Sequence, residues 1–397
     1  MVDNGGMSPR RVLQALPIQA GPGAIDALTA LRRALDGEGP ALLPVDAGDP
    51  DQAGVLRHAL AAGDPLLPGE DDADDPTALV VGTSGSTGTP KGVLLAASAL
   101  RASAHATHDR LGGPGHWLLA LPPHHIAGVQ VLVRALLSGT KPRAVDVTGG
   151  FRPGPFVEAA QRTLGADGPH YTSLVPTQLS RLLDEENSLR ALRGFDAVLL
   201  GGAATPRPLL CRARDSGVAI VRTYGMSETA GGCVYDGVPL DGAEVRIDGA
   251  EPGPIALSGP MLARGYRRGE RFDAWFRTGD LGTWRDGRLD VLGRGDDVII
   301  TGGVNVAPAQ VERPLVEHAG VREACAVGLD DAEWGQIVAA AVVPVDASAP
   351  PPVAELREAV RARCGSAAAP KRVAYVEELP LRGPGKTDRE GVRALLR

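Results

Sequence analysis

Strand-like and helical segments alternate through the middle of the chain, and this alternation restricts the fold more than any other feature. A short β-type run, TALVVG, occupies residues 77–82, and residues 96–111 have helical character. Further strand-like runs are HWLLALP, PRAVDV, HYTSLVP and FDAVLLGG, and helical segments separate them. Such alternation is typical of α/β proteins, in which helices cover largely buried sheets.

The second half of the chain changes character twice. Residues 236–300 contain many turns and short strand-like runs, which predicts a β-rich region. Helical and strand-like segments then mix again up to residue 364. Since 397 residues are too many for one compact core, we predict a large domain followed by a smaller one.

The composition excludes several classes of protein. A formal net charge of −7 gives no general attraction to nucleic acid. The four cysteines are widely spaced and include no C-x-x-C pair, which favours reduced thiols over a disulfide framework. No apolar run approaches the roughly 18 residues of a membrane span, and the first residues lack a signal-peptide core. We therefore expect a cytoplasmic, enzyme-sized protein.

A loop rich in glycine and hydroxyl residues follows the first predicted strand of the alternating region. Residues 83–93, TSGSTGTPKGV, contain three glycines, five hydroxyl residues and Lys91. Successive N–H groups and hydroxyls of such a loop can surround phosphate oxygens, and a lysine adds positive charge. It is not a Walker loop, because Lys91 follows a proline and no hydroxyl residue comes after it. The pattern predicts a phosphate site of another kind.

Lysine is rare in this chain, which has only Lys91, Lys141, Lys371 and Lys386. Lys386 lies in PLRGPGKT, which ends in the G-K-T of a Walker loop. Pro380 occupies the position of that motif's first glycine, so we expect no P-loop NTPase. Lys141 and Lys371 lie in no motif and are predicted to be surface residues.

Five segments together resemble the adenylate-forming superfamily, which contains acyl-CoA synthetases, adenylation domains and luciferase. The first is the loop at residues 83–93, which is similar to that family's phosphate loop. The others are YGMSET (224–229), RTGD (277–280), GRGDDVIITGGVNVAPAQVE (293–312) and LPLRGPGKTDR (379–389). They occur in the family's order and span roughly residues 80 to 390, which makes coincidence an unsatisfactory explanation.

The resemblance implies that a carboxylate attacks the α-phosphorus of ATP and that pyrophosphate leaves. Positive charge and hydrogen-bond donors are needed wherever two anions meet in this way. Tyr224 would pack against adenine, Ser227 would lie near the α-phosphate, and Glu228 would hold Mg²⁺. The full set implied for ATP binding is Thr83, Ser84, Gly85, Ser86, Thr87, Gly88, Lys91, Gly202, Ala203, Tyr224, Gly225, Met226, Ser227, Asp280 and Arg294.

Within that set, residues 84–88 and Lys91 would hold the β- and γ-phosphates. Asp280 would accept hydrogen bonds from the ribose hydroxyls, with Arg294 as a second ribose or phosphate contact. The catalytic lysine of the family corresponds to Lys386. Its compact ammonium would contact both the attacking carboxylate and an α-phosphate oxygen, where the larger planar guanidinium of arginine would fit poorly.

The same resemblance implies two domains that change their relative orientation. Residues 1–294 would form the N-terminal adenylation domain of α/β layers with a β-rich subdomain. Residues 295–397 would form a small, mobile C-terminal α+β domain, with Asp296 at the hinge. Hinges are a few residues that absorb a large change in φ and ψ. After rotation, Gly303 would line the tunnel for coenzyme A, the second co-substrate.

The acid would bind near residues 120–139, ALPPHHIAGVQVLVRALLSG, which resemble the acyl pocket of CoA ligases. His125 matches the residue that guards the carboxylate there and joins Lys386 and Glu228 as a catalytic candidate. The strings PPHHIAG and SLVPTQL most resemble the branch of the family that joins o-succinylbenzoate to coenzyme A in menaquinone biosynthesis. Because that acid has two carboxylates, a second cation is needed. The substrate candidates are His125, Gly225, Met226, Arg134 and Arg222.

Other functions remain open at this point. Another aryl- or acyl-CoA ligase, a free-standing adenylation enzyme and a non-catalytic nucleotide-binding protein would share much of the pattern. The region before the phosphate loop, about 80 residues, is shorter than in many family members, which leaves the walls of the acyl pocket uncertain. The expected partners are a small carboxylic acid, ATP and coenzyme A, and a homodimer is an open expectation.

We expect Lys386→Ala to slow adenylation by roughly two to three orders of magnitude, the usual effect of losing a donor to the transition state. Attack of coenzyme A on pre-formed acyl-adenylate should stay nearly unchanged. The two half-reactions can be measured separately, by ATP–pyrophosphate exchange and by thioester formation. Equal loss in both would contradict the role given to Lys386.

Overall fold

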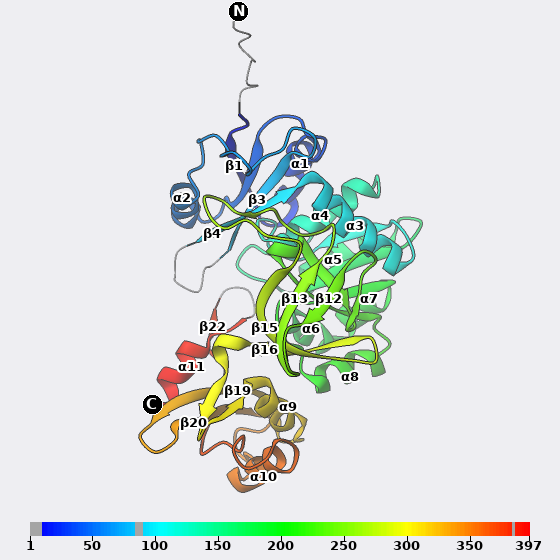
Figure 1. Cartoon of the computed structure of the whole chain (residues 1–397). Helices are drawn as coiled ribbons and strands as arrows, with labels where there is room; N and C mark the ends of the chain where they lie inside the picture. Colours follow the sequence, from blue (N-terminus) through cyan, green and yellow to red (C-terminus); the bar gives the residue numbers. More distant parts are fainter. Residues whose placement is uncertain (1–9, 84–89, 383–385) are drawn as a thin grey trace, which may run out of the picture.

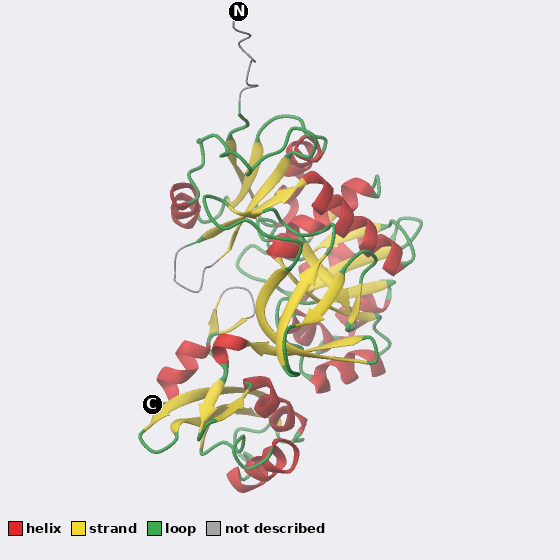
Figure 2. Cartoon of the chain, viewed as in Figure 1, coloured by secondary structure: helices red, strands yellow, loops and turns green. Residues whose placement is uncertain are grey.

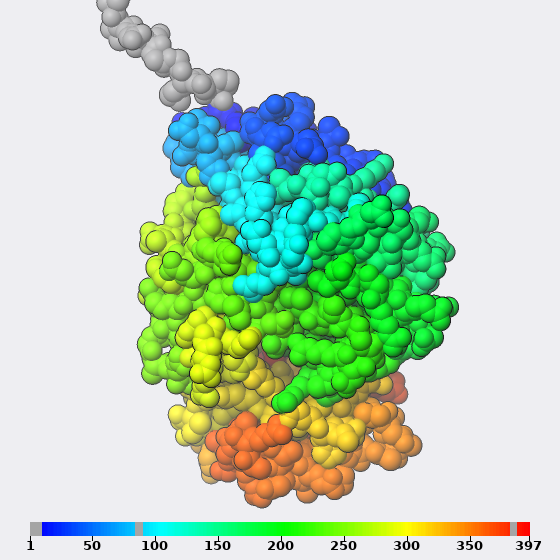
Figure 3. Space-filling model, turned by 90° about the vertical axis from the view of Figure 1, so that its right-hand side faces the viewer, coloured from blue at the N-terminus to red at the C-terminus, as the bar shows by residue number. Residues whose placement is uncertain are grey.

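The computed structural model describes residues 10–83, 90–382 and 386–397 (Figure 1). The chain forms several sheets, and the larger ones pack against helices or against one another (Figure 2). In the space-filling view the orange C-terminal residues lie directly against the green part of the large domain (Figure 3). The predicted architecture, a large α/β domain with a β-rich part and a small α+β domain, is confirmed.

The N-terminal subdomain is a five-stranded sheet in the order β1-β2-β3-β4-β14. Its strands are β1 (Leu13–Ile18), β2 (Ala41–Asp46), β3 (Thr77–Thr83), β4 (Lys91–Ala96) and β14 (Gly265–Tyr266). Its helices are η1 (Gly21–Ala27), α1 (Leu28–Leu35) and α2 (Pro50–Ala59). The first helical segment of the chain begins as the 3-10 turn η1, whose residues Gly21, Ala24 and Ala27 are buried, and continues as α1.

A seven-stranded sheet forms the centre of the large domain, in the order β11-β10-β9-β8-β7-β5-β6. Its parallel strands are β5 (His116–Leu119), β6 (Arg143–Ala144), β7 (His170–Leu174), β8 (Ala197–Leu200) and β9 (Ile220–Met226). Antiparallel β10 (Gly231–Tyr235) and β11 (Val238–Pro239) extend it. The strand expected from PRAVDV is reduced to its first residues.

Helices cover both faces of this central sheet. They are α3 (Ala97–Leu111), α4 (Ile126–Leu137), α5 (Pro153–Leu164), α6 (Pro176–Leu183), α7 (Glu186–Arg193) and α8 (Arg207–Asp215). Along β5, Trp117 and Leu119 belong to one hydrophobic core, whereas Leu118 belongs to a second. The period of two in a strand sends neighbouring side chains to opposite faces, so strands buried on both sides are apolar throughout.

The β-rich region is confirmed as an antiparallel sheet in the order β12-β13-β15-β16. Its strands are β12 (Glu244–Ile247), β13 (Gly253–Ser258), β15 (Phe276–Arg285) and β16 (Arg288–Arg294). A short η2 turn (Ser227–Thr229) precedes β10, and η3 (Gly295–Asp297) follows β16. The chain passes into the small domain at η3.

The small domain has a sheet of β17 (Ile299–Thr301), β18 (Val304–Val306), β19 (Val321–Asp331), β20 (Gly335–Pro344) and β21 (Arg372–Tyr375). Its helices are α9 (Pro308–Glu317), α10 (Val353–Cys364) and α11 (Arg389–Leu396). Side chains of α9 and α10 share one core, and those of α11 share a second with β19 and β20. A separate ribbon of β22 (Leu381–Arg382) and β23 (Lys386–Thr387) precedes α11.

Within the described ranges, no helix combines the length and the hydropathy that crossing a membrane requires.

Lys371 lies over the ring of Trp334, with its Nζ atom 3.4 Å from the ring centroid.

A buried ion pair joins Arg267, just after β14, to Glu70 in the loop between α2 and β3. The side chains of Arg267 and Glu70 are 0% and 1% exposed and contact each other directly. Arg267 also donates to the Pro65 carbonyl oxygen at 3.1 Å, and Glu70 accepts from the Leu67 N–H at 2.8 Å. Loss of one partner would leave an uncompensated charge in the interior.

We expect Arg267→Met to lower the free energy of unfolding by about 3–5 kcal/mol, because Glu70 would remain buried without its cation. Arg268→Gln is the matched control, since the Arg268–Asp64 pair is about half exposed. Exposed pairs contribute about 1 kcal/mol or less. Urea denaturation followed by tryptophan fluorescence measures both, and similar losses in the two variants would contradict the prediction.

Candidate active site

The carboxyl ends of β7, β8 and β9 open into a cleft of about 3130 Å³. Residues of the N-terminal subdomain, the central sheet, the β-rich sheet and the small domain all line it. Ligands of α/β proteins bind at this edge of a parallel sheet, because the loops that follow the strands meet there. Gly202, which has φ +80°, and Ala203 follow β8 and line the cleft, and both are ATP-binding candidates from the sequence.

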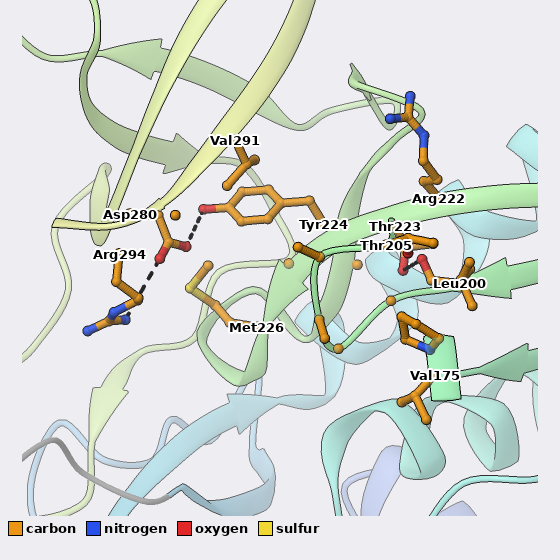
Figure 4. A pocket seen from close by; sticks show the side chains of 18 of the residues that line it. Val175, Leu200, Thr205, Arg222, Thr223, Tyr224, Met226, Asp280, Val291 and Arg294 are labelled. Atoms are coloured by element: carbon orange, nitrogen blue, oxygen red, sulfur yellow. Dashed lines mark hydrogen bonds and ion pairs between the residues drawn. The ribbon is translucent and has the colours of Figure 1, made fainter. Parts of the chain in front are cut away.

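Tyr224 on β9 and Asp280 on β15 are joined across the cleft (Figure 4). The Tyr224 hydroxyl donates to Asp280 Oδ2 at 2.8 Å. Burial raises the pKa of the Tyr224 hydroxyl, and the Asp280 carboxylate raises it further, so the hydroxyl stays protonated as a donor. Burial also raises the pKa of Asp280, while the hydrogen bond from Tyr224 opposes that rise. Two residues that are 56 positions apart in the chain thus form one polar site.

Arg294 lies beside this pair and extends it toward the small domain. Its Nη1 atom is 3.9 Å from Asp280 Oδ1, and its Nε atom donates to Asp296 Oδ1 at 3.1 Å. The hydrogen bond from Arg294 holds the pKa of Asp296 below its ordinary value. The residue predicted to contact ribose and the residue predicted to be the hinge are therefore in direct contact.

Glu228, Tyr266 and Lys91 form a second group that lines the cleft. The Tyr266 hydroxyl donates to Glu228 Oε1 at 2.8 Å. Lys91 lies over the same tyrosine, with its Nζ atom 4.7 Å from the ring centroid. Sequence reasoning missed Tyr266, because its strand β14 belongs to none of the motifs and only its pairing with β4 brings it here.

The described residues include no group of three or more histidines, cysteines or carboxylates able to hold a metal ion. A single carboxylate such as Glu228 nevertheless fits Mg²⁺. This ion usually binds one or two protein carboxylates and completes its shell with phosphate oxygens and water.

A tight hairpin between β9 and β10 presents Gly225 and Met226 to the cleft. The Thr229 hydroxyl accepts from the Met226 N–H at 2.9 Å and donates to the Gly231 carbonyl oxygen at 2.7 Å. A Cβ atom on Gly225 would lie 2.1 Å from that same Gly231 oxygen. Glycine is therefore required at position 225 for the two strands to approach so closely.

Arg134 reaches the cleft from α4 and is only 3% exposed. Its guanidinium lies 5.1 Å from the centroid of the Trp117 ring, and Nη2 is 3.5 Å from the Tyr235 hydroxyl. Among the described residues no carboxylate lies within ion-pair distance, and Nε has no hydrogen-bond partner. Burial lowers the pKa of this guanidinium, yet arginine remains charged at neutral pH. A buried cation without a counter-ion favours an anionic ligand.

Gln130 lies one helical turn before Arg134 and shares this part of the cleft. It is 0% exposed, and its Nε2 atom donates to the Ala230 carbonyl oxygen at 2.7 Å. Its Oε1 atom has no partner among the described residues. Sequence reasoning missed it, although a glutamine four residues before an arginine in an otherwise apolar helix is a detectable signal.

The other acyl-pocket candidates differ in their surroundings. His125 directly precedes α4 and lines the cleft. Arg222 is about half exposed and donates to Asp236 at 3.0 Å, and its side chain points away from the Tyr224–Asp280 pair (Figure 4). Arg134 is thus the stronger candidate for an anionic substrate group, because Arg222 already has a carboxylate partner.

Some predicted residues cannot be placed at the cleft. Ser84, Gly85, Ser86, Thr87 and Gly88 lie outside the described residues, as does the side chain of Lys386. The residues on either side of the loop are described, and Thr83 pairs with Lys91 across β3 and β4. Gly303 lies in the turn between β17 and β18, apart from the residues that line the cleft.

Comparison with known proteins identifies the family. Residues 25–267 match the AMP-binding enzyme family, and residues 310–386 match the AMP-binding enzyme C-terminal domain. The chain therefore belongs to the AMP-binding enzymes, and the resemblance seen in its motifs is confirmed.

Individual relatives narrow the similarity. A probable 2-succinylbenzoate–CoA ligase of Mycobacterium tuberculosis is 47% identical over 385 residues, which cover 95% of this chain and 97% of that protein. The 2-succinylbenzoate–CoA ligase of Geobacillus kaustophilus is 35% identical over 347 residues. This alignment covers 80% of this chain and 69% of that protein.

A solved structure of the Bacillus subtilis o-succinylbenzoate CoA synthetase, in complex with its acyl-adenylate intermediate, aligns with a TM-score of 0.77. It is 25% identical, and the alignment covers 97% of this chain and 89% of that one. The same enzyme in complex with ATP and magnesium ion aligns with a TM-score of 0.71 at 25% identity, over 98% and 90% of the two chains.

We expect Tyr224→Phe to make AMP binding more sensitive to acid. Burial raises the pKa of Asp280, and the hydrogen bond from Tyr224 lowers it. Without the tyrosine hydroxyl the pKa of Asp280 should therefore rise further. A carboxylate is lost as an acceptor once the pH falls through its pKa, so AMP affinity should begin to fall at a higher pH than in the parent protein. Calorimetric titrations of AMP across a pH series measure this.

Tyr266→Phe is the matched control, because it removes a hydroxyl from Glu228 instead of from Asp280. If both variants lose AMP affinity with the same pH profile, the hydrogen bond between Tyr224 and Asp280 does not determine the pH dependence of AMP binding.

Proposed function

We propose that the protein is an ATP-dependent acid–thiol ligase that adenylates o-succinylbenzoate and then transfers the acyl group to coenzyme A. The observation that carries this proposal is the 47% identity to a probable 2-succinylbenzoate–CoA ligase over nearly the whole of both chains. The buried, unpaired guanidinium of Arg134 supports the same substrate, since o-succinylbenzoate keeps one free carboxylate while the other reacts.

In the first half-reaction a carboxylate oxygen of the acid forms a bond to the α-phosphorus, and the bond to pyrophosphate breaks. Tyr224 would pack against adenine while its hydroxyl keeps Asp280 oriented for the ribose hydroxyls. Lys91 and the loop at residues 84–88 would hold the departing phosphates. Glu228 would hold Mg²⁺, which neutralises charge on the phosphate oxygens.

Lys386 would bridge the two reacting anions in this step. Its backbone lies in β23, and the neighbouring residues Thr387 and Arg389 line the same cleft as Tyr224 and Asp280. Coenzyme A is proposed as the acceptor of the second half-reaction, with Gly303 reaching the thiol channel after the small domain rotates about Asp296. We place the domain boundary between Arg294, the last residue of β16, and Gly295, the first residue of η3.

The acid would lie along α4, between its amino end and Arg134. His125 would guard the reacting carboxylate at that end, and Gly225 and Met226 would form the adjoining wall. The distal carboxylate would pair with Arg134 inside the protein, where a charge pair is strong because little water competes.

A cytoplasmic location is part of this proposal. All four cysteines are free thiols, Cys211 exposed, Cys233 and Cys325 buried, and Cys364 half-buried, as a reducing compartment maintains them. A homodimer remains an expectation, and light scattering of the purified protein would test it.

ATP–pyrophosphate exchange with a panel of acids tests the proposed substrate. We expect exchange with o-succinylbenzoate and little with benzoate, medium-chain fatty acids or amino acids. Exchange with one of the other acids instead would identify a different ligase, and binding of ATP without any exchange would indicate a non-catalytic nucleotide-binding protein.

We expect Arg134→Gln to slow adenylation of o-succinylbenzoate by at least about thirtyfold, since truncating one side of a buried charge pair costs about 2–5 kcal/mol. The analogue 3-benzoylpropionate lacks the carboxylate on the ring, which is the distal one of o-succinylbenzoate. With this analogue, Arg134→Gln and the parent enzyme should react at similar rates. Initial rates of pyrophosphate exchange measure the four combinations.

Arg222→Gln is the matched control and should change neither substrate's rate by more than a few fold. If Arg222→Gln shows the selective loss and Arg134→Gln does not, the distal carboxylate is held by Arg222.

A further inference from the structure

Arg389, the first residue of α11, binds three separate parts of the small domain. Its Nη1 and Nη2 atoms donate to Glu312 Oε1 at 2.6 Å and to Glu312 Oε2 at 3.3 Å. Nη1 also donates to the Ala326 carbonyl oxygen at 2.7 Å, and Nε lies 3.2 Å from Asp297 Oδ2. Two carboxylates from different elements therefore converge on a single guanidinium.

The carboxylates belong to elements with different roles. Glu312 lies on α9 and is held in place, because its Oε1 atom also accepts from the Ala326 N–H at 2.9 Å. Asp297 lies in η3, the turn that joins the two domains and that contains Asp296. Burial raises the pKa of Asp297, and the charge of Arg389 opposes that rise. The side chains of Arg389 and Asp297 are each only 26% exposed, so this contact is partly shielded from water.

Arg389 is also close in sequence to the strand that carries the catalytic lysine. In the ribbon β22–β23, Leu381 pairs with Thr387 and Arg382 pairs with Lys386. Each strand has two residues, and the ribbon joins no larger sheet among the described residues. A two-stranded ribbon is only marginally stable by itself. Its direction therefore depends on the contacts that anchor its base.

Two contacts hold that base. The Asp388 N–H donates to the Pro380 carbonyl oxygen at 2.8 Å, and the Asp388 side chain caps α11 by accepting from the Glu390 N–H at 3.2 Å. The next residue, Arg389, makes the contacts to Glu312, Ala326 and Asp297. No other described residue joins this end of the ribbon to the η3 turn through an ion pair.

We propose that Arg389 is a positioning residue for the adenylation step, which couples the η3 turn to the strand that carries Lys386. In the arrangement seen here, the Asp297–Arg389 contact fixes the base of the ribbon and so the position of the strand that carries Lys386. Arg389 touches no substrate in this role and acts through Lys386. The inference rests on the proposed function, because only the adenylation step needs this lysine.

A purely structural role for Arg389 predicts a different outcome. The docking of α11 onto the sheet has other contributions, since Val392 and Leu396 are buried in the core shared with β19 and β20. Arg393, one turn further along α11, donates to the Gly328 carbonyl oxygen at 3.3 Å. Arg393→Gln therefore removes the same charge and the contact to Gly328. It leaves in place the hydrogen bonds and the ion pair that Arg389 makes to Glu312 and Asp297.

The test compares the two half-reactions in Arg389→Gln, Arg389→Lys and Arg393→Gln. We expect Arg389→Gln to slow pyrophosphate exchange by about tenfold to a hundredfold, the effect of a misplaced catalytic group. Thioester formation from pre-formed acyl-adenylate should change less than twofold. Arg389→Lys should restore part of the exchange rate, because a lysine keeps the charge but cannot grip two carboxylates at once. Arg393→Gln should change neither half-reaction more than twofold.

Asp297→Asn provides a second test that leaves the Arg389–Glu312 contact intact, and it stands even if Arg389→Gln folds poorly. We expect a several-fold loss of exchange with thioester formation spared. An unchanged exchange rate in Asp297→Asn, or equal losses in both half-reactions of the Arg389 variants, would overturn the inference. If the parent enzyme gives no exchange with o-succinylbenzoate, the proposed function fails instead, and exchange with the acid it does use then tests Arg389.

Discussion

The meeting of β7, β8 and β9 at one edge of the central sheet is the constraint on which the site depends. Parallel strands bring the segments that follow them to the same edge, and here those segments supply Gly202, Ala203 and the YGMSET motif. The β-rich sheet then closes this edge from outside and adds Asp280. The cleft forms where two sheets meet, and neither sheet supplies all of its lining.

Two buried arginines of this protein differ in whether a carboxylate accompanies them. Arg267 and Glu70 are buried as a pair, so their charges balance within the fold. Arg134 is buried as deeply but has no carboxylate partner in the part of the chain that the structure describes. Since an isolated buried charge is costly, a cation left in this state fits a site that an anion completes. The contrast makes Arg134, and not Arg267, the candidate for binding an anionic ligand.

The small domain is built around two hydrophobic cores. Helices cover both faces of its sheet, with α9 and α10 in one core and α11 in the other. Its connection to the large domain is the short η3 turn, whose Asp296 contacts Arg294 and whose Asp297 contacts Arg389. The two adjacent carboxylates thus bind different arginines, Arg294 at the end of β16 and Arg389 at the start of α11. The turn is therefore linked both to Asp280 in the cleft, through Arg294, and to the helix that follows the strand of Lys386.

The sequence by itself determined the α/β alternation, the β-rich region, the family and most of the nucleotide-binding candidates. These depend on local patterns, such as strand periodicity, a glycine-rich loop and short motifs with Asp280 or Glu228. Only the tertiary structure decided that Tyr266 reaches Glu228, that Gln130 and Arg134 line the cleft, and that Arg222 is paired with Asp236. Those facts depend on contacts between residues distant in the chain, and burial and pairing are properties of the packed molecule that no local pattern encodes.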